Sequence, residues 1–246
     1  MEWSDEGIVL SARKHGENSV IAHVLTRAHG RHGGLVRGGT GKRARGIWMP
    51  GNRVQATWRG RLPEHLGAFT GELTEAIAAG HLNDPARLAA LSAACAVTEA
   101  ALPEREAHPD VFEGLLVLLH SLGGETWPTV YVKWELGVLG ELGYGLDLSA
   151  CAATGVVEDL SHVSPKSGRA VSRAATGPNL DSLLPLPPFL LRADAVGGAD
   201  EILDGLRLSG YFLERYVFSP HGADMPPARG RLIARLRRDD AGPDGL

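Results

Sequence analysis

The sequence predicts an α+β protein in which a small β-barrel at the N-terminus precedes an α-helical domain. About the first 75 of its 246 residues consist of short segments of alternating polarity, separated by glycine-containing turns. From Asp84 onward, apolar residues recur with the period of amphipathic helices instead. We therefore expect two domains, residues 1–80 and residues 81–246.

The charge of the chain changes sign close to the same boundary. The first 66 residues contain eleven Lys and Arg against five Asp and Glu, a net charge of +6, whereas the remainder carries −10. The total of −4 argues against nucleic acid as a partner. Phosphate binding, however, depends on the local field within about 8–10 Å at physiological salt. The distribution therefore favours an anionic partner for the N-terminal domain.

Five segments of the N-terminal domain have the composition and alternation of β-strands. No helical segment separates them, which is typical of a small barrel of the OB type, and an SH3-like barrel fits nearly as well. The expected strands are Gly7–Arg13, Ser19–Thr26, Gly34–Arg37, Arg53–Arg59 and Leu66–Leu73.

Start and stop signals mark the helices of the C-terminal domain. Asp84 followed by Pro85 is an N-cap with proline at the first helical position, and Gly143 ends a later helix. Residues 147–180 lack a regular pattern, so we expect an irregular insert there, and residues 183–188 form a proline-broken connector. The expected helices are Asp84–Leu102, Pro109–Leu122, Trp127–Leu142, Gly198–Phe218 and Pro226–Arg238.

Composition also bears on the compartment. No run of 18 apolar residues is present, which excludes a membrane-spanning helix. The N-terminal segment carries acids where a secretory signal requires positive charge, so the expected location is the cytoplasm. Cys95, in an Ala/Leu-rich helical segment, is expected to be a buried thiol rather than half of a disulfide.

The segment Arg37–Gly46 combines glycines with four cations, a composition suited to close contact with phosphate. We expect a loop between two strands that binds nucleic acid; the alternative is a solvated basic loop without a ligand. Trp48 beside it is a candidate for stacking on a base, although an aromatic residue between Ile and Met is more often part of a core. The cations expected to contact DNA are Arg31, Arg37, Lys42, Arg43, Arg45 and Arg59.

The motifs do not support other chemistries. A nucleotide-binding P-loop would need a glycine at Val36 and a hydroxyl at Arg43, so both requirements fail. His29 and His32 flank a turn, but no local carboxylate or cysteine accompanies them to complete a metal site. Neither a nucleophile elbow nor a zinc-protease motif occurs. We expect a protein that is not an enzyme and that uses no metal or cofactor.

Three parts of the chain together form a recognisable pattern. The first lies within residues 7–38 and includes Gly16-Glu-Asn-Ser19. The second and sharpest is Lys133–Leu136 followed by Leu139–Leu148 and Cys151, a basic-aromatic helix that ends in Leu-Gly-Tyr. The third is Ser164–Val171. In this order, covering nearly the whole chain, these segments resemble the RecO family of bacterial recombination mediators and DNA repair proteins.

The resemblance implies an OB-type DNA-binding domain without catalysis of bond chemistry, in a cytoplasmic, nucleoid-associated protein. Members of the family bind single- and double-stranded DNA, anneal complementary strands coated by single-strand-binding protein, and act with RecR to help load RecA. Their helical domain receives the acidic tail of single-strand-binding protein. Lys133, Arg207 and Arg215 are the residues expected at that tail site, with ordinary solvent-exposed helix charges as the alternative.

One departure from the family concerns the insert, where many relatives bind zinc through two Cys-x-x-Cys pairs. Here Thr154 stands at the partner position of Cys151, and Val171–Thr176, where the second pair falls, contains no cysteine. One thiolate cannot hold a structural zinc ion, so we expect a zinc-finger-like insert that lacks the metal ligands. Two alternatives to a DNA mediator stay open: an OB-type protein that binds structured RNA, and a non-catalytic protein-interaction scaffold.

Overall fold

The computed structural model describes residues 1–62 and 65–240. The chain divides into two compact units, which we call the barrel unit (Met1–Gly123 with Pro226–Leu232) and the helical unit (Gly124–Met225 with the chain from Ile233). The compact units therefore do not divide at residue 80, where strands give way to helices. In the described ranges, no helix is both long and apolar enough to cross a membrane.

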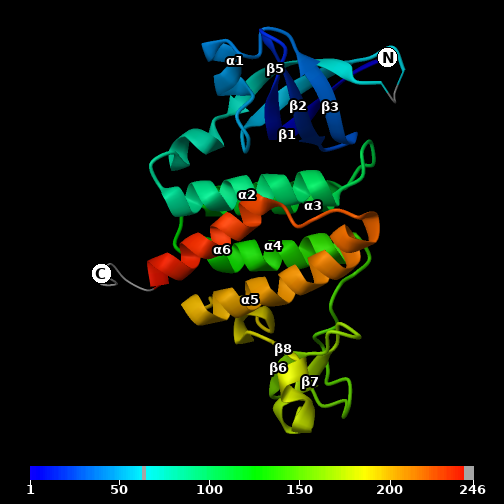
Figure 1. Cartoon of the computed structure of the whole chain (residues 1–246), viewed down its shortest axis with the longest axis vertical. Helices are drawn as coiled ribbons and strands as arrows, with labels where there is room; N and C mark the ends of the chain where they lie inside the picture. Colours follow the sequence, from blue (N-terminus) through cyan, green and yellow to red (C-terminus); the bar gives the residue numbers. More distant parts are fainter. Residues whose placement is uncertain (63–64, 241–246) are drawn as a thin grey trace. The chain divides into compact units, whose positions relative to one another are not determined.

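Five strands form the N-terminal barrel: β1 (Glu2–His15), β2 (Ser19–Thr26), β3 (Gly30–Val36), β4 (Arg53–Arg59) and β5 (Gly67–Glu75). They close in the order β1-β2-β3-β5-β4 and form the barrel that Figure 1 shows beside α1. β1 pairs with β4 through its first half and with β2 through its second half, and a register shift between Val9 and Ser11 marks a bulge in it. Parallel pairing of Gly34 with Gly67 completes the ring. This architecture confirms the expected N-terminal barrel.

Glycine inside the strands allows close packing of the barrel interior. Trp58 and Phe69 fill the core and are at most 2% exposed. A Cβ atom at Gly34 would lie 2.4 Å from the Phe69 ring, so only glycine fits at that position without rearrangement. β3 accordingly begins at Gly30, four residues before its expected start, because the glycines that suggest a turn belong to the strand.

A short helix, α1 (Lys42–Ile47), corrects the expectation of a loop between the third and fourth strands. A helix of this length shows no period in the sequence and depends on its surroundings. Asn52, which is 2% exposed, donates from Nδ2 to the carbonyl of Gly46 at 2.8 Å. Its Oδ1 accepts from the backbone N–H of Ala78 at 3.2 Å. Asn52 thereby fixes the C-terminal end of α1 to the barrel unit.

The barrel unit continues with a 3₁₀ turn (Ile77–His81), α2 (Pro85–Ala101) and α3 (Pro109–Ser121). The sequence predicts both α-helices nearly to the residue. Asp84 caps α2 as expected, because its Oδ1 accepts from the N–H groups of Ala86 and Arg87, each at 3.0 Å.

α2 packs against β1. Cys95 is 1% exposed, and its Sγ lies 3.8 Å from the carbonyl oxygen of Val9. Burial raises the pKa of the Cys95 thiol to about 12, which keeps the thiol protonated and unreactive.

The helical unit is built around α4 (Trp127–Glu141) and α5 (Ala199–Phe212), which continues as a π-helix (Leu213–Phe218). α6 (Pro227–Asp240) begins in the barrel unit and continues in the helical unit. α4 and α5 approach closely at Gly205, where a Cβ atom would lie 2.8 Å from Val132. Nearby, the hydroxyl of Ser209 donates to the buried carboxylate of Glu135. These helices confirm the predicted segments.

The insert is more regular than expected, because it contains a three-stranded sheet with the order β7-β6-β8. The strands are β6 (Leu160–Val163), β7 (Ala170–Ser172) and β8 (Leu184–Pro185). Strands of four residues or fewer show no alternation that sequence could reveal. The predicted connector at 183–188 therefore supplies the strand β8.

Hydrogen bonds hold Cys151 in this insert. Its Sγ accepts from the backbone N–H of Ser172 at 3.3 Å and from the Ser172 hydroxyl at 3.4 Å. The backbone N–H of Cys151 donates to Val156 at 2.7 Å. The Ser172 hydrogen bonds lower the pKa of the Cys151 thiol to about 6. Within the described residues, no group of three or more His, Cys, Asp and Glu side chains could hold a metal ion.

Candidate nucleic-acid interface

Ten of the eleven cations of the first 66 residues fall into two groups, while the eleventh, Arg61, is exposed and belongs to neither. The first group is paired with carboxylates. Several of these arginines pair with carboxylates that lie far away in the sequence. Because such carboxylates come from outside the first 66 residues, they neutralise much of the positive charge excess of that segment. The paired arginines are Arg13 with Glu99, Arg27 with Glu6 and Glu113, Arg31 with Glu104, Arg53 with Glu6 and Glu75, and Arg59 with Glu2.

The second group, which we call the basic end, consists of Lys14, Arg37, Lys42, Arg43 and Arg45. All five side chains are exposed. Among the described residues, none of the five has a carboxylate within salt-bridge distance. Their charge is therefore available to an external anion.

Strand register brings the basic end together. Lys14 pairs with Val20 across the β1–β2 hairpin, and Val20 pairs with Val36, the residue before Arg37. The backbone N–H of Thr40 donates to the carbonyl of Asn18 at 3.4 Å, which ties the segment leading into α1 to the same hairpin turn.

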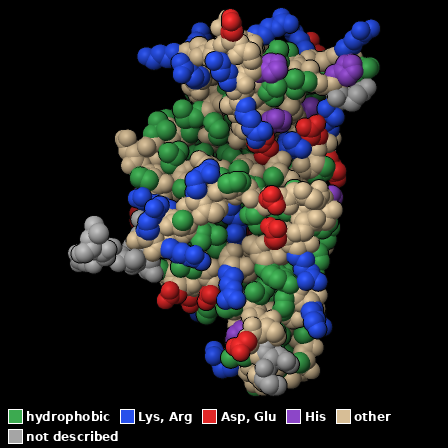
Figure 2. Space-filling view, in the orientation of Figure 1, with side chains coloured by type: hydrophobic (Ala, Val, Ile, Leu, Met, Phe, Trp, Pro, Cys, Tyr) green, Lys and Arg blue, Asp and Glu red, His purple; other side chains and the backbone are tan. Residues whose placement is uncertain are grey.

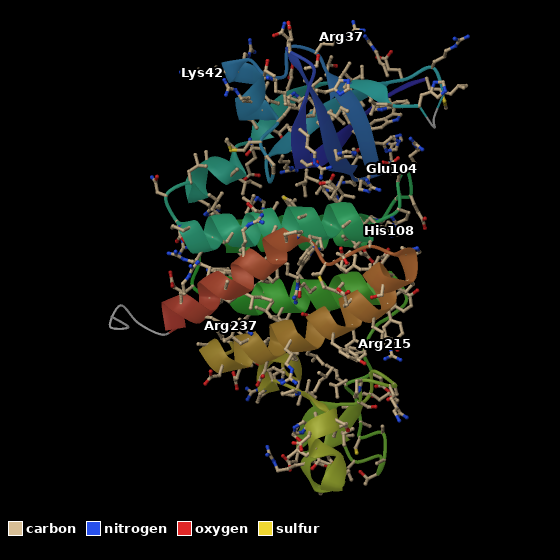
Figure 3. All side chains as sticks on the ribbon, in the orientation of Figure 1. Arg37, Lys42, Glu104, His108, Arg215 and Arg237 are labelled. Carbon is tan, nitrogen blue, oxygen red and sulfur yellow. The ribbon has the colours of Figure 1, made fainter. Side chains whose placement is uncertain are left out.

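The figures show the same arrangement. Arg37 and Lys42 lie at one end of the barrel, away from the end where Glu104 lies (Figure 3). Lys and Arg side chains gather on the barrel surface in the space-filling view (Figure 2).

Two of the expected DNA contacts lie outside this cluster. Arg31 donates from Nε to the carbonyl of Leu102 at 3.0 Å and pairs with Glu104, and its side chain is 16% exposed. It anchors the α2–α3 connection instead of presenting a charge to solvent. Arg59 is 66% exposed but lies 2.6 Å from Glu2. The hydrogen bond between them raises the pKa of Arg59 and lowers that of Glu2.

Trp48 does not stand on the barrel surface as a free stacking platform, because its ring is packed into the barrel core. Only 4% of its surface is exposed. Its ring packs 5.7 Å from that of Phe69, between centroids, within the barrel core. Trp48 is therefore a core residue, which is the alternative that its Ile and Met neighbours suggested.

The histidines of the β2–β3 turn contact aromatic rings and a carboxylate. His29 lies 3.0 Å from Asp5 through Nδ1 and stacks on Trp3 with a centroid distance of 4.3 Å. His32 is 6% exposed and lies edge-on to Trp3 and Trp58. Burial lowers the pKa of His32, so this side chain is neutral near pH 7 and adds no charge.

Ser11, His23 and Glu99 contain the residue types of a catalytic triad, but their geometry differs from one. The Ser11 hydroxyl and the Glu99 carboxylate each lie 3.2 Å from the same ring atom, His23 Nδ1. A triad places acid and nucleophile on opposite nitrogens of the imidazole, so in this cluster Glu99 does not orient His23 as a general base for Ser11.

The three expected tail-binding residues of the helical unit have different surroundings. Lys133 Nζ donates to the carbonyls of Arg192, Ala193 and Ala195 at 3.2, 3.0 and 3.4 Å, so it fixes the chain before α5. Arg207 is exposed on α5.

Arg215, on the π-helix that follows α5, is also exposed. It donates to the Tyr211 hydroxyl at 3.0 Å, and its guanidinium lies 5.6 Å from the Tyr216 ring. The hydrogen bond that Arg215 donates to Tyr211 raises the pKa of Arg215. The charges of Arg207 and Arg215 are thus exposed to solvent, whereas the ammonium group of Lys133 donates to backbone carbonyls.

Sequence reasoning missed Lys14 as a member of the basic end. The predicted hairpin between the first two strands could have indicated its position. If Lys14 and Val20 flank the turn, the end of the next strand must lie beside them. Lys14 then joins Arg37 at the same barrel end.

Comparisons with known proteins agree with the fold. The family model described as "Recombination protein O N terminal" matches residues 1–77, and "Recombination protein O C terminal" matches residues 82–224. The chain is 53% identical over 240 residues to DNA repair protein RecO of Rhodospirillum centenum, covering 97% of this chain and 96% of that protein. The protein of that name from Rhodospirillum rubrum is 53% identical over 245 residues, covering 97% of each. That from Caulobacter vibrioides is 47% identical over 241 residues, covering 98% of this chain and 99% of its own. The two family models and these near full-length relatives show that the chain belongs to the RecO family.

Proposed function

We propose that this protein binds DNA through the basic end of its barrel and acts as a non-catalytic mediator of DNA recombination and repair. Membership in a family named for recombination and DNA repair supports the proposal. The observation that carries the proposal is the group of five exposed cations without acidic partners in the described part of the chain. Such charges neutralise phosphates and release counterions, which is the main source of sequence-independent affinity for DNA.

A basic surface of this kind supports annealing as well as binding. Two complementary strands repel each other unless cations reduce the repulsion between their phosphates. We propose that the basic end brings strands coated by single-strand-binding protein close enough to pair, and that the protein acts with RecR to help load RecA. In this role it binds single- and double-stranded DNA and is associated with the nucleoid.

Removing charge from α1 tests DNA binding directly. The Lys42→Ala, Arg43→Ala, Arg45→Ala triple variant should bind a single-stranded oligonucleotide at least about tenfold more weakly at physiological salt, because three phosphate contacts are lost. Fluorescence anisotropy with a labelled strand measures the change. The same titration with RNA of matched sequence tests the RNA alternative, since an RNA reader exploits the 2′-hydroxyl.

A matched control removes equal charge elsewhere. Arg169, Arg173 and Arg192 are exposed arginines of the helical unit, each paired with an aspartate. Replacing these three with alanine should leave DNA affinity within about twofold of wild type. If the control triple weakens binding as much as the α1 triple, the assignment to the basic end is wrong.

The exposed arginines of the helical unit are the proposed site for the acidic tail of single-strand-binding protein. Arg207→Ala with Arg215→Ala should weaken binding of a synthetic acidic tail peptide, because the two charges that attract its carboxylates are removed. Isothermal titration calorimetry measures the loss. Lys133→Ala should act differently: it frees three carbonyls and lowers stability as well. Unchanged peptide affinity in the double variant would contradict this site.

A further inference from the structure

A pocket of about 560 Å³ opens at the basic end of the barrel unit. Its floor is apolar and is made by Val20, Trp48, Met49 and Pro50. Val20 and Trp48 are buried residues of the barrel core, so this floor is fixed by the fold rather than by a mobile loop. Binding sites for small organic groups have volumes of about 300–1,000 Å³ and mostly apolar walls, and this pocket matches both properties.

The rim of the pocket is polar and positively charged. Lys14 enters from the β1–β2 hairpin, Arg45 from α1, and Thr40 from the segment between β3 and α1. Lys14 and Arg45 are exposed, and neither pairs with a carboxylate in the part of the chain that the structure describes. Two cations therefore flank an apolar hollow that is large enough for a planar ring.

A second pocket, of about 730 Å³, lies beside α1 and provides a comparison. It is lined by Arg43, but also by the carboxylate-bearing Glu72. A carboxylate in the wall disfavours a phosphate nearby, because like charges repel. Only the first of these two pockets combines an apolar floor with a rim whose charges are all positive.

We propose that the first pocket receives one unpaired nucleobase of a DNA strand, while Lys14 and Arg45 contact the phosphates on either side of it. This inference rests on the proposed function and deepens it, since it adds to phosphate binding at the basic end a contact that only an unpaired base can make. An isolated phosphate is charged and hydrated, so it gains no binding energy from the apolar floor. A base within a duplex is stacked and paired, and therefore cannot enter. The base is held by its apolar faces, so the pocket accepts any of the four bases.

Two oligonucleotides of equal length separate base contacts from phosphate contacts. One is an ordinary single strand, and the other carries abasic sites throughout with the same number of phosphates. The wild-type protein should bind the ordinary strand about fivefold more tightly or better, because only that strand can fill the pocket. Fluorescence anisotropy competition against a labelled strand gives both affinities.

Two variants fill the pocket from different sides: Ala12→Met from β1 and Thr40→Leu from the rim. Each should bind both oligonucleotides equally, at the affinity that the wild-type protein has for the abasic strand, and each should keep wild-type affinity for duplex DNA. Arg43→Ala is the charge control, since it lies on α1 outside this pocket; it should weaken both strands by the same factor and keep the preference. Near-ultraviolet circular dichroism establishes that each variant is folded.

The outcomes distinguish this inference from the proposed function. Equal affinity of the wild-type protein for the two strands overturns the base pocket but leaves phosphate binding at the basic end intact. A preference that persists in both folded pocket-filling variants also overturns it. Failure of the wild-type protein to bind either strand overturns the proposed function, and this inference with it.

Discussion

Single residues of the barrel carry the same charge but differ in what that charge can do. Arg31 and Arg37 lie on β3 and just after it. The side chain of Arg31 is 16% exposed and is neutralised by Glu104, whereas Arg37 is exposed and lacks an acidic partner among the described residues. A guanidinium held by a carboxylate must give up that pair before it can bind phosphate. The proposed DNA contacts are therefore the cations that are exposed and not paired with a carboxylate, rather than all the cations of the barrel.

Buried histidines should make the barrel unit sensitive to acid. Burial is the main cause that lowers the pKa of His23, His32 and His81. Unfolding returns each pKa to its ordinary value near 6.5, so below that pH the unfolded state binds more protons than the folded state. Stability therefore falls as the pH drops below about 6.5. Thermal unfolding followed by circular dichroism should give a lower Tm at about pH 5.5 than at about pH 7.5.

One variant of the core and one of the surface isolate this effect. His32→Gln removes a buried titrating group, so the difference in Tm between the two pH values should shrink. His15→Gln, at the exposed end of β1, should retain the wild-type difference. A His32→Gln protein with an unchanged pH response would show that this histidine does not contribute.

At the scale of elements, the buried side chain of Asn52 helps to hold α1 in place, together with the packing of Ala44 and Ile47 against the barrel core. Asn52→Ala removes the hydrogen bond to Gly46 and leaves the backbone N–H of Ala78 without its partner. We expect a loss of about 1–3 kcal/mol in the free energy of unfolding, measured with urea. DNA affinity of the folded variant should fall as well, because Lys42, Arg43 and Arg45 are then no longer held in one arrangement.

The control for this element is Asn18→Ala in the β1–β2 turn. The carbonyl of Asn18 accepts from Thr40, but its exposed side chain is not used in that contact. Both stability and DNA affinity should therefore stay close to wild type. A folded Asn52→Ala protein with wild-type DNA affinity would mean that α1 need not be fixed in place for binding.

At the scale of the whole molecule, a chain of net charge −4 is proposed to bind a polyanion. The proposal requires that binding depend on the five cations of the basic end. This dependence can be measured as the slope of log Kobs against log[salt]. If all five contact phosphates of a single strand, log Kobs should fall with log[salt] with a slope of about −3.5. The α1 triple variant should reduce the magnitude of that slope by about 2. A wild-type slope near zero would contradict electrostatic binding.

The sequence by itself determined the order and type of most elements. The N-cap of α2, the prolines that open α3 and α4, and the alternation of β2 and β4 are local signals that act within a few residues. The +6 charge of the first 66 residues and the resemblance to the RecO family can also be read directly from the chain. α1 and the three-stranded sheet of the insert escaped prediction because elements this short have no period of their own.

Only the tertiary structure decided which cations are available and where they meet. Arg13 and Glu99 are 86 residues apart in the sequence, and Arg31 and Glu104 are 73 apart, so neither pair leaves a local signal. Closure of the barrel places Lys14 beside the end of β3 and turns Trp48 into the core. The physical reason is that ion pairing and burial depend on distances in space, which the chain sets only once its strands have found their register.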